Sequence, residues 1–261
     1  FSDTGTNWGS PGNLATFQVD SWSDSTITFT VPNPSGTGGQ WHVTPGTPAS
    51  VRVTTSTGST SDAAVLEIAP SANQAAYYDN VGISPDTNQA CANYDGDGYS
   101  YSAQALASAG LSPGAAVKAD GATLTWPKVT PCSADNILAA GQTVLLPGES
   151  GPTKLVLLGS SSNGSSSGTV TIHYTDGSTS TGTVSFNDWA GGPSGADTAI
   201  ATMPYRNTTG GRSQPITMYV YATSVPVSSA KTVASVTLPD VAGHVGSRTT
   251  AMHVFALGLG G

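Results

Sequence analysis

The sequence predicts an all-β protein built from two consecutive β-sandwiches. Three observations lead to this fold class. Charged residues make up only 9% of the 261 positions, segments suited to long helices are nearly absent, and short apolar stretches alternate with turns rich in Gly, Ser, Thr and Pro. The chain is long enough to bury a substantial hydrophobic core, although its length alone is compatible with one large domain or two smaller ones.

The first predicted domain comprises residues 1–73 and is a small β-sandwich. Between residues 25 and 31 the side chains alternate with period two, which places Ile27 and Phe29 on one face and threonines on the other. The predicted strands are 25–31, 49–55 and 62–68. Residues 70–75 follow as a linker that is too short to let the two domains move freely.

The second predicted domain comprises residues 74–261 and holds about ten strands, enough for a two-sheet sandwich. These strands are expected at 81–84, 123–126, 142–146, 154–158, 169–174, 183–186, 200–203, 216–222, 233–238 and 252–257. One short helix is predicted at 103–109, because Ser102 is a suitable N-cap and Gly110 a suitable C-terminal stop.

The composition excludes two classes of partner. The net charge is −8 and Lys and Arg together number eight, whereas nucleic-acid binding needs a clustered basic face that displaces counterions from phosphates. We therefore expect no nucleic-acid partner. No apolar run reaches the roughly 18 residues of a membrane span, so we expect no membrane partner either. The low Lys content and the abundance of Ser and Thr predict a secreted, extracellular protein whose signal peptide has been removed.

Cys91 and Cys132 are the only cysteines, and their even number in a chain of secreted character predicts a disulfide. This bond closes a loop of about 40 residues and stabilises the fold by roughly 4 kcal/mol through loop entropy. It also restrains the loop that carries Asp95 and Asp97. The alternative is a pair of buried free thiols.

The stretch from Asn93 to Tyr101 is the densest in usable chemistry, with two acids, two glycines and three tyrosines. Asn93, Asp95 and Asp97 follow the spacing of the first oxygen ligands of a calcium loop, and the glycines allow a tight turn. Gln104 stands where such a loop has a bidentate Glu. A structural Ca2+ held by Asn93, Asp95 and Asp97 is one interpretation, and a turn that binds nothing is the other.

Three segments of the first domain carry a family resemblance. They are GTNWG at 5–9, VDSWSDSTITFTVP at 19–32, and the strand pair between Val51 and Ile68. Together they resemble an immunoglobulin-like IPT/TIG domain, which implies an immunoglobulin fold over most of this region. Such domains have a strand before the first of these segments, so we expect residue 1 to be a cut point in a longer protein. In secreted bacterial enzymes, IPT/TIG domains resemble spacers between other domains, so the resemblance implies a spacer role for this region.

The second domain carries a more specific resemblance, over residues 77–257. Its motifs are DNVGIS at 79–84, NYDGxGYSYSAQAL at 93–106, TWP at 125–127, DN at 135–136, AGQ at 140–142, YTDG at 174–177, DW at 188–189 and PYRN at 204–207. They resemble the β-sandwich module appended to secreted actinobacterial glycoside hydrolases, including alpha-mannosidases and fucosidases. The resemblance implies a galactose-binding-like, jelly-roll carbohydrate-binding domain that is attached to an enzyme.

A glycan site needs an aromatic face for the C–H patches of a pyranose and planar polar groups for its hydroxyls. The second domain concentrates such groups in its predicted loops, where aromatic side chains are harder to explain as core. The carbohydrate-binding candidates are Tyr99, Tyr101, Asp188, Trp189, Tyr205, Arg206 and Asn207. The alternative is that Trp189 caps one end of the sandwich and that Arg206 pairs with Asp188.

The predicted function is that of a non-catalytic accessory region of a secreted glycoside hydrolase, which binds carbohydrate through loops of the second sandwich. The expected partners are a polysaccharide or glycan and the catalytic domain of the parent chain. Catalysis is not expected, because no Gly-x-Ser-x-Gly precedes a helix and no two histidines have the i, i+4 spacing of a metal site. The alternatives are a purely structural role and a cell-surface adhesion module without a sugar ligand.

Overall fold

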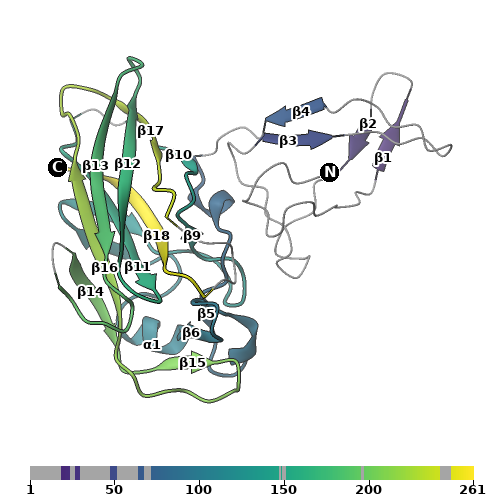
Figure 1. Ribbon diagram of the computed structural model, residues 1–261, viewed down its shortest axis with the longest axis vertical. Coiled ribbons are helices and arrows are strands. Elements are labelled where there is room, and N and C mark those ends of the chain that lie inside the picture. Colours follow the sequence, from purple (N-terminus) through teal and green to yellow (C-terminus); the bar gives the residue numbers. More distant parts are fainter. Residues whose placement is uncertain are drawn as a thin grey trace. The chain divides into compact units, whose positions relative to one another are not determined.

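The computed structural model describes residues 19–23, 27–29, 48–51, 64–67, 72–146, 148, 151–194, 197–241 and 248–261. The chain divides by its internal contacts into two units, Phe1–Ala69 and Pro70–Gly261, whereas the sequence placed the boundary between residues 73 and 74. Most regular structure in the described ranges is β-strand, accompanied by short helices (Figure 1). The prediction of an all-β fold is confirmed.

The described part of the first unit consists of two antiparallel strand pairs. β1 (Val19–Trp22) pairs with β2 (Ile27–Phe29), and β3 (Pro48–Val51) pairs with β4 (Ala64–Glu67). β2, β3 and β4 overlap the three predicted strands of this region, whereas β1 was not predicted as a strand. Val31, residues 52–55 and Ile68 of the predicted strands lie outside the described residues.

The second unit is built on two antiparallel sheets. The four-stranded sheet has the order β10 (Thr143–Leu145), β17 (Val233–Thr237), β12 (Ser166–Tyr174), β13 (Thr179–Phe186). The five-stranded sheet has the order β14 (Thr198–Met203), β16 (Met218–Pro226), β11 (Lys154–Ser162), β18 (Ala251–Gly260), β9 (Ile137–Leu138). Several strands extend beyond their predicted ends, because the apolar pattern from which the ends were predicted stops where polar residues continue the strand.

A hydrophobic core lies between these two sheets. In β12 the side chains alternate, so that Val170 and Ile172 are fully buried while Thr169 on the opposite face is exposed. Val170 and Ile172 belong to one cluster with Leu155 and Leu157 of β11, in the facing sheet. The second unit is therefore a β-sandwich, as predicted.

The five-stranded sheet is buried on its other face as well. Val156 and Leu158 of β11, which alternate with the core-facing leucines, belong to a second cluster together with Leu106 of α1 (Ala103–Ser108). A strand covered on both faces needs apolar residues on both, which gives a continuous apolar run in place of alternation. This is why β11 begins with the uninterrupted run from Leu155 to Leu158.

Smaller elements cover this second face. They are β5 (Ile83–Ser84), η3 (Gln89–Cys91), β6 (Tyr99–Ser102), β7 (Ala116–Ala119), β8 (Ala122–Thr125) and β15 (Arg206–Thr208). By contrast, η2 (Gln74–Tyr77) contacts β10, and its Tyr77 belongs to the core between the two sheets. β7 pairs with β8, and β6 lies between β15 and β5, which runs parallel to it. In Figure 1, α1, β5, β6 and β15 lie together at one end of the second unit.

The helix α1 begins where the sequence predicted. The Oγ atom of Ser102 accepts a hydrogen bond from the backbone N–H of Ala105 at 3.1 Å, so Ser102 is the N-cap. Gly110 follows the helix with a φ of 90°, the left-handed conformation that commonly ends a helix. The prediction of a short α-helix over 103–109 is confirmed to within one residue at its end.

Gly159 marks a β-bulge in the ladder between β11 and β18, where the register shifts after Leu158. A Cβ atom on Gly159 would lie 2.2 Å from the carbonyl oxygen of His253 and 2.7 Å from the ring of Phe186. Only glycine fits this close approach of two backbones. The bulge separates the apolar first half of β11 from Ser160–Ser162, its polar second half.

The predicted disulfide is confirmed. Cys91, at the end of η3, is bonded to Cys132, and their Cα atoms are 5.3 Å apart. The bond ties the segment just before Asn93 to the segment just before Asp135. A disulfide is compatible with an extracellular location. Within the described ranges, no helix is long and apolar enough to cross a membrane.

Replacing both cysteines, as Cys91→Ser with Cys132→Ser, is expected to lower the free energy of unfolding by about 4 kcal/mol, because the unfolded chain regains the entropy of a loop with a sequence separation of 41 residues. Urea denaturation of the double variant measures this change. The unmodified protein in strong reductant serves as control and should reach the same value. Equal stability of oxidised protein and double variant would show that the bond contributes nothing.

Candidate functional site

The predicted cation loop is organised by its own backbone. The Oδ1 atom of Asp95 accepts hydrogen bonds from the N–H groups of Asp97 (2.9 Å) and Tyr99 (3.2 Å), and Oδ1 of Asn93 accepts one from the N–H of Gly98 (2.8 Å). Gly96 and Gly98 have φ angles of 79° and 89°, which glycine adopts without strain. These contacts form a tight turn in which Oδ1 of Asp95 and Oδ1 of Asn93 already accept hydrogen bonds from the backbone.

Two arginines approach the same loop. Arg206 lies 3.9 Å from a carboxylate oxygen of Asp95, and Arg248 lies 2.7 Å from one of Asp97. Gln104, which stands at the last ligand position of a calcium loop, accepts a hydrogen bond from the backbone of Asp86 instead. In the described part of the chain, no three His, Cys, Asp or Glu side chains are grouped as a metal site would need. Calcium at Asn93, Asp95 and Asp97 stays a prediction.

The fold brings most of the predicted carbohydrate-binding residues together. The pairing of β6 with β15 sets Tyr101 opposite Arg206 and Tyr99 opposite Thr208. The ring of Trp189 lies 4.9 Å from that of Tyr101, centroid to centroid, and 5.4 Å from the guanidinium carbon of Arg206. Residues distant in sequence therefore form one aromatic and polar group at the end of the sandwich.

Burial corrects the expected role of three of these residues. Trp189 is 2% exposed, while Tyr101 and Asn207 are fully buried. The Trp189 indole packs against Tyr94 and Tyr101 and belongs to the second hydrophobic cluster. A side chain without accessible surface cannot stack on a sugar, so these three residues support the loops from within. The loop after Asp188 folds back and carries the ring inward, which its Gly-rich sequence did not indicate.

Asp188 serves as a turn residue. Its carboxylate accepts hydrogen bonds from the backbone N–H groups of Gly164 (2.6 Å) and Ala190 (2.8 Å). The alternative pairing of Arg206 with Asp188 is not what the structure shows. Arg206 instead donates from Nε to Oε1 of Gln214 at 2.7 Å and approaches Asp95.

Tyr205 and Asn207 converge on Asp86, which the sequence analysis did not single out. The Asp86 carboxylate accepts hydrogen bonds from Ser102 Oγ (2.6 Å), Tyr205 OH (2.7 Å) and Asn207 Nδ2 (3.0 Å). Burial acts to raise the pKa of Asp86, but these three donors outweigh it and the pKa lies below its usual value. The hydroxyl of Tyr205 and the amide of Asn207 thus hold β15, the short strand that carries Arg206.

Among the candidates, Tyr99, Asp188, Tyr205 and Arg206 keep some accessible surface, and the Arg206 side chain is 13% exposed. The guanidinium carbon of Arg206 lies 3.6 Å from the centroid of the Tyr99 ring, a cation–π contact. Gln214, which pairs with Arg206 through two backbone hydrogen bonds, fixes the guanidinium through Nε. The structure therefore offers, at a loop surface, a ring and a planar donor group held in one place.

A second group of polar residues, missed by the sequence analysis, lies deep in the protein. Ser162 Oγ lies 2.9 Å from His253 Nε2, and His253 Nδ1 lies 2.8 Å from Oδ1 of Asn136. Asn136 Nδ2 in turn donates to Asp135 at 2.7 Å. The order serine, histidine and amide has the hydrogen-bond pattern of a hydrolase triad.

The surroundings of this group argue for a structural role. Ser162 and His253 are each 1% exposed, and Asn136 is fully buried, so a substrate has no access to the hydroxyl. The ring of Tyr94 stacks on that of His253 at 3.8 Å, and burial lowers the pKa of His253 to about 3. The imidazole is therefore neutral. These residues satisfy one another inside a sheet that is covered on both faces.

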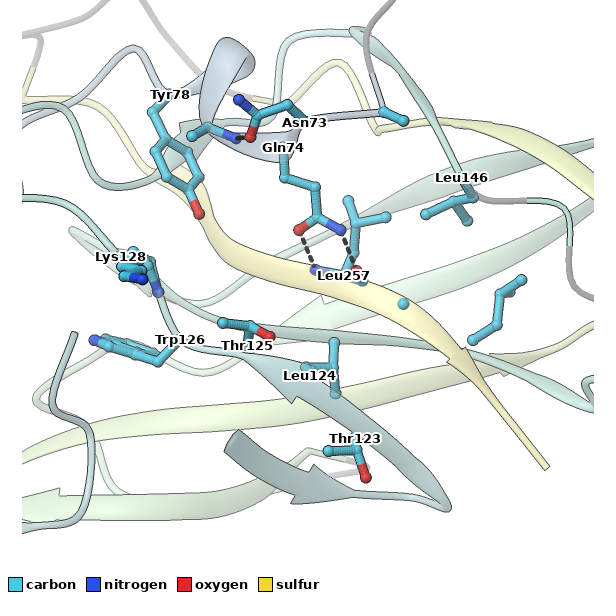
Figure 2. A pocket seen from close by; sticks show the side chains of 15 residues that line it. Asn73, Gln74, Tyr78, Thr123, Leu124, Thr125, Trp126, Lys128, Leu146 and Leu257 are labelled. Carbon is cyan, nitrogen blue, oxygen red and sulfur yellow. Dashed lines mark hydrogen bonds between the residues drawn. The ribbon is translucent and has the colours of Figure 1, made fainter. Parts of the chain in front are cut away.

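The second unit also contains a cavity of about 530 Å³ beside β8 and β18 (Figure 2). In Figure 2 the side chain of Gln74 reaches β18 and forms two hydrogen bonds with the backbone of Leu257. The lining residues are Ala72, Asn73, Gln74, Ala75, Tyr78, Thr123, Leu124, Thr125, Trp126, Pro127, Lys128, Leu146, Leu257, Gly258 and Leu259. Lys128 is the one charged residue among them, and the sequence analysis assigned this region no role.

Comparison with known protein families matches residues 70–245 to the family described as AziU2-like beta-sandwich domain. The match covers about two thirds of the chain and most of the second unit. It agrees with the β-sandwich seen in the structure. No curated protein matches the chain.

Trp189→Ala is expected to lower the free energy of unfolding by about 3–5 kcal/mol, because it leaves a cavity beside Tyr94 and Tyr101. Tyr99→Ala, in the same group but half-buried, should cost clearly less. Urea denaturation of both variants gives the comparison. Unchanged stability of Trp189→Ala would contradict the buried position of the ring and restore it as a candidate for sugar stacking.

The stability difference between the unmodified protein and His253→Gln is expected to shrink by about 2–3 kcal/mol between pH 7 and pH 4.5. The unfolded chain takes up a proton at His253 near pH 6.5, whereas the native protein does so only near pH 3. The His253 contribution to stability is therefore present above pH 6.5 and is lost as the pH falls, and the variant lacks it.

Denaturant titrations at several pH values measure this difference. Burial raises the pKa of Asp79 and of Asp135 to about 7, which acts in the opposite direction, favouring the native state as the pH falls. Because both acids are present in both proteins, their effects cancel when the two curves are subtracted. A difference that stays constant over this pH range would show that His253 is not kept neutral by the fold.

Proposed function

This chain belongs to the AziU2-like beta-sandwich domain family, and we propose that its second unit is a non-catalytic module that binds a glycan at the loop surface around β6 and β15. The observation that supports this most directly is the contact of Arg206 with Tyr99 at 3.6 Å, braced by Gln214. It presents a planar donor group and an aromatic ring together on a half-buried surface.

Sugar recognition uses both kinds of group. Hydroxyl pairs of a pyranose match the fixed N–H fork of a guanidinium, and its C–H patches match an aromatic ring. Nε of Arg206 is engaged by Gln214, and the approach to Asp95 is long at 3.9 Å. The guanidinium therefore keeps donors for a ligand while its position is fixed, which lowers the entropic cost of binding.

The proposed setting is an accessory region of a secreted glycoside hydrolase. In this setting the first unit is an IPT/TIG-like immunoglobulin-fold spacer and the second a jelly-roll, galactose-binding-like module whose partner is the catalytic domain of the parent chain. The motifs quoted above support this setting, and the bond between Cys91 and Cys132 is compatible with secretion. The burial of Ser162 and His253 supports the absence of hydrolase chemistry at that group.

A purely structural or adhesive role is the alternative, and one observation favours it. Several polar groups beside Arg206 have partners within the protein, as Asp86, Gln214 and Asp95 illustrate. In that case the contact of Arg206 with Tyr99 stabilises the end of the sandwich and serves no ligand.

Arg206→Ala is expected to weaken glycan binding at least tenfold, because it removes the fixed donor group. Affinity electrophoresis of the whole chain in mannans, galactans and other plant and fungal polysaccharides detects the binding. Arg212→Ala is the matched control, since Arg212 is an exposed arginine in the turn that follows β15 and its substitution removes the same charge. Binding that survives Arg206→Ala in a folded variant would move the site elsewhere, and no binding to any glycan would support the structural role.

A further inference from the structure

One edge of β18 is only partly paired. Along its other edge β18 pairs with β11 from Lys154 to Ser162, but β9 covers only His253 and Val254. Beyond β9 the edge is met by side chains: Tyr78 donates its hydroxyl proton to the carbonyl oxygen of Phe255 at 2.9 Å. Beyond β9, β18 is therefore itself the edge strand of the five-stranded sheet.

Gln74 occupies this edge as a peptide group would. Its Oε1 atom accepts a hydrogen bond from the N–H of Leu257 at 3.1 Å, and its Nε2 group donates to the carbonyl oxygen of the same residue. A carboxamide has the same planar donor and acceptor as a peptide unit. Gln74 thus reproduces both bonds of a residue in an added strand.

The next position along the edge has no such cover. In an antiparallel ladder the backbone groups of alternate residues point to the same side, and both groups of Leu257 point away from β11, toward Gln74. The register with Leu155 and Leu157 is regular here, so the N–H and C=O of Leu259 point the same way. No described residue hydrogen-bonds them, and Leu259 is half-buried.

The cavity of about 530 Å³ lies along this edge and has a size typical of ligand sites. Leu257 and Leu259 line it from β18, and Thr123 and Thr125 line it from β8. Its one charged lining residue, Lys128, is exposed. The cavity therefore combines apolar side chains, an open backbone edge and a single positive charge.

We propose that this cavity is the docking site for an extended peptide segment that carries a carboxylate and belongs to a partner protein. The segment adds to the edge of β18, where it pairs with Leu259 and displaces Gln74 from Leu257. Its acidic side chain faces Lys128. This site is separate from the glycan surface around Arg206, so neither proposal depends on the other.

Other occupants fit these features less well. A purely apolar ligand leaves the backbone groups of Leu259 without partners, which is costly in a half-buried position. A sugar would need an aromatic face, and Trp126 in the lining is 1% exposed. A second copy of this edge would bring a second Lys128 to the cavity, and like charges repel.

The test uses fluorescence polarisation of the whole chain with a labelled, N-acetylated and C-amidated peptide of sequence Thr-Val-Glu-Val-Thr. We expect saturable binding that Lys128→Glu weakens about tenfold. Lys118→Glu is the matched control, because Lys118 is an exposed lysine on β7 outside the cavity lining, and it should bind as the unmodified protein does. Gln74→Ala should strengthen binding several-fold, since the peptide no longer has to displace the carboxamide.

A version of the peptide with N-methyl groups on alternate residues separates strand addition from simple filling of the cavity, because it cannot donate to the carbonyl oxygens of the edge. We expect it to bind at least tenfold more weakly. Equal binding of both peptides would overturn the strand pairing. Absence of binding to both the unmodified protein and Gln74→Ala would overturn the site. Light scattering that shows dimers of Gln74→Ala which the peptide does not dissociate would assign the edge to a second copy and overturn the peptide.

Discussion

The constraint on which the second unit depends is the covering of its five-stranded sheet on both faces. β11 and β18 lie in the middle of this sheet, and nearly all of their residues are inaccessible to water. Every apolar residue there contributes about 25 cal/mol for each Å² it buries, but every polar group must find a partner inside the protein. The arrangement of the smaller elements follows from these two requirements.

The polar half of β11 shows how the second requirement is met. Ser160, Ser161 and Ser162 reach the hydroxyls of Tyr94 and Tyr101, the carbonyl oxygen of Ala251 and the ring of His253, respectively. These partners come from three segments: the turn that carries Tyr94, β6 with Tyr101, and β18 with Ala251 and His253. The buried hydrogen bonds therefore fix the position of each segment that covers the sheet. The groups that remain accessible lie at the rim of the unit, on the Arg206 surface and at the edge of β18.

Sequence patterns predicted the fold class, the helix with its Ser102 cap and the disulfide, because each depends on nearby residues or on a count of two cysteines. They also located the turn at Asp95, whose glycines adopt positive φ angles as a turn requires. They did not locate the end of β11. Three serines resemble a turn, and their partners lie up to 91 residues away in sequence, where no local pattern can indicate them.

The residues of the candidate surface were predicted only in part, again because contacts between residues distant in sequence leave no local pattern. The sequence brought Tyr99 and Arg206 into one hypothesis, and β6 and β15 place them in contact. It could not separate them from Trp189, because exposure depends on how a loop folds over the core. Asp86 and Gln74 were missed, since an isolated acid or amide acquires its role only from the backbone and hydroxyl groups that tertiary structure brings to it.

Gly159 restricts how far this domain can diverge. A side chain there meets the backbone of His253 and the ring of Phe186 at once, so accommodating it would require β18 and β13 to move together. Compensation by a single second mutation is therefore unavailable at this position. The glycine between the apolar run and the row of serines is therefore a position at which the central strand β11 accepts no side chain without a shift of two neighbouring strands.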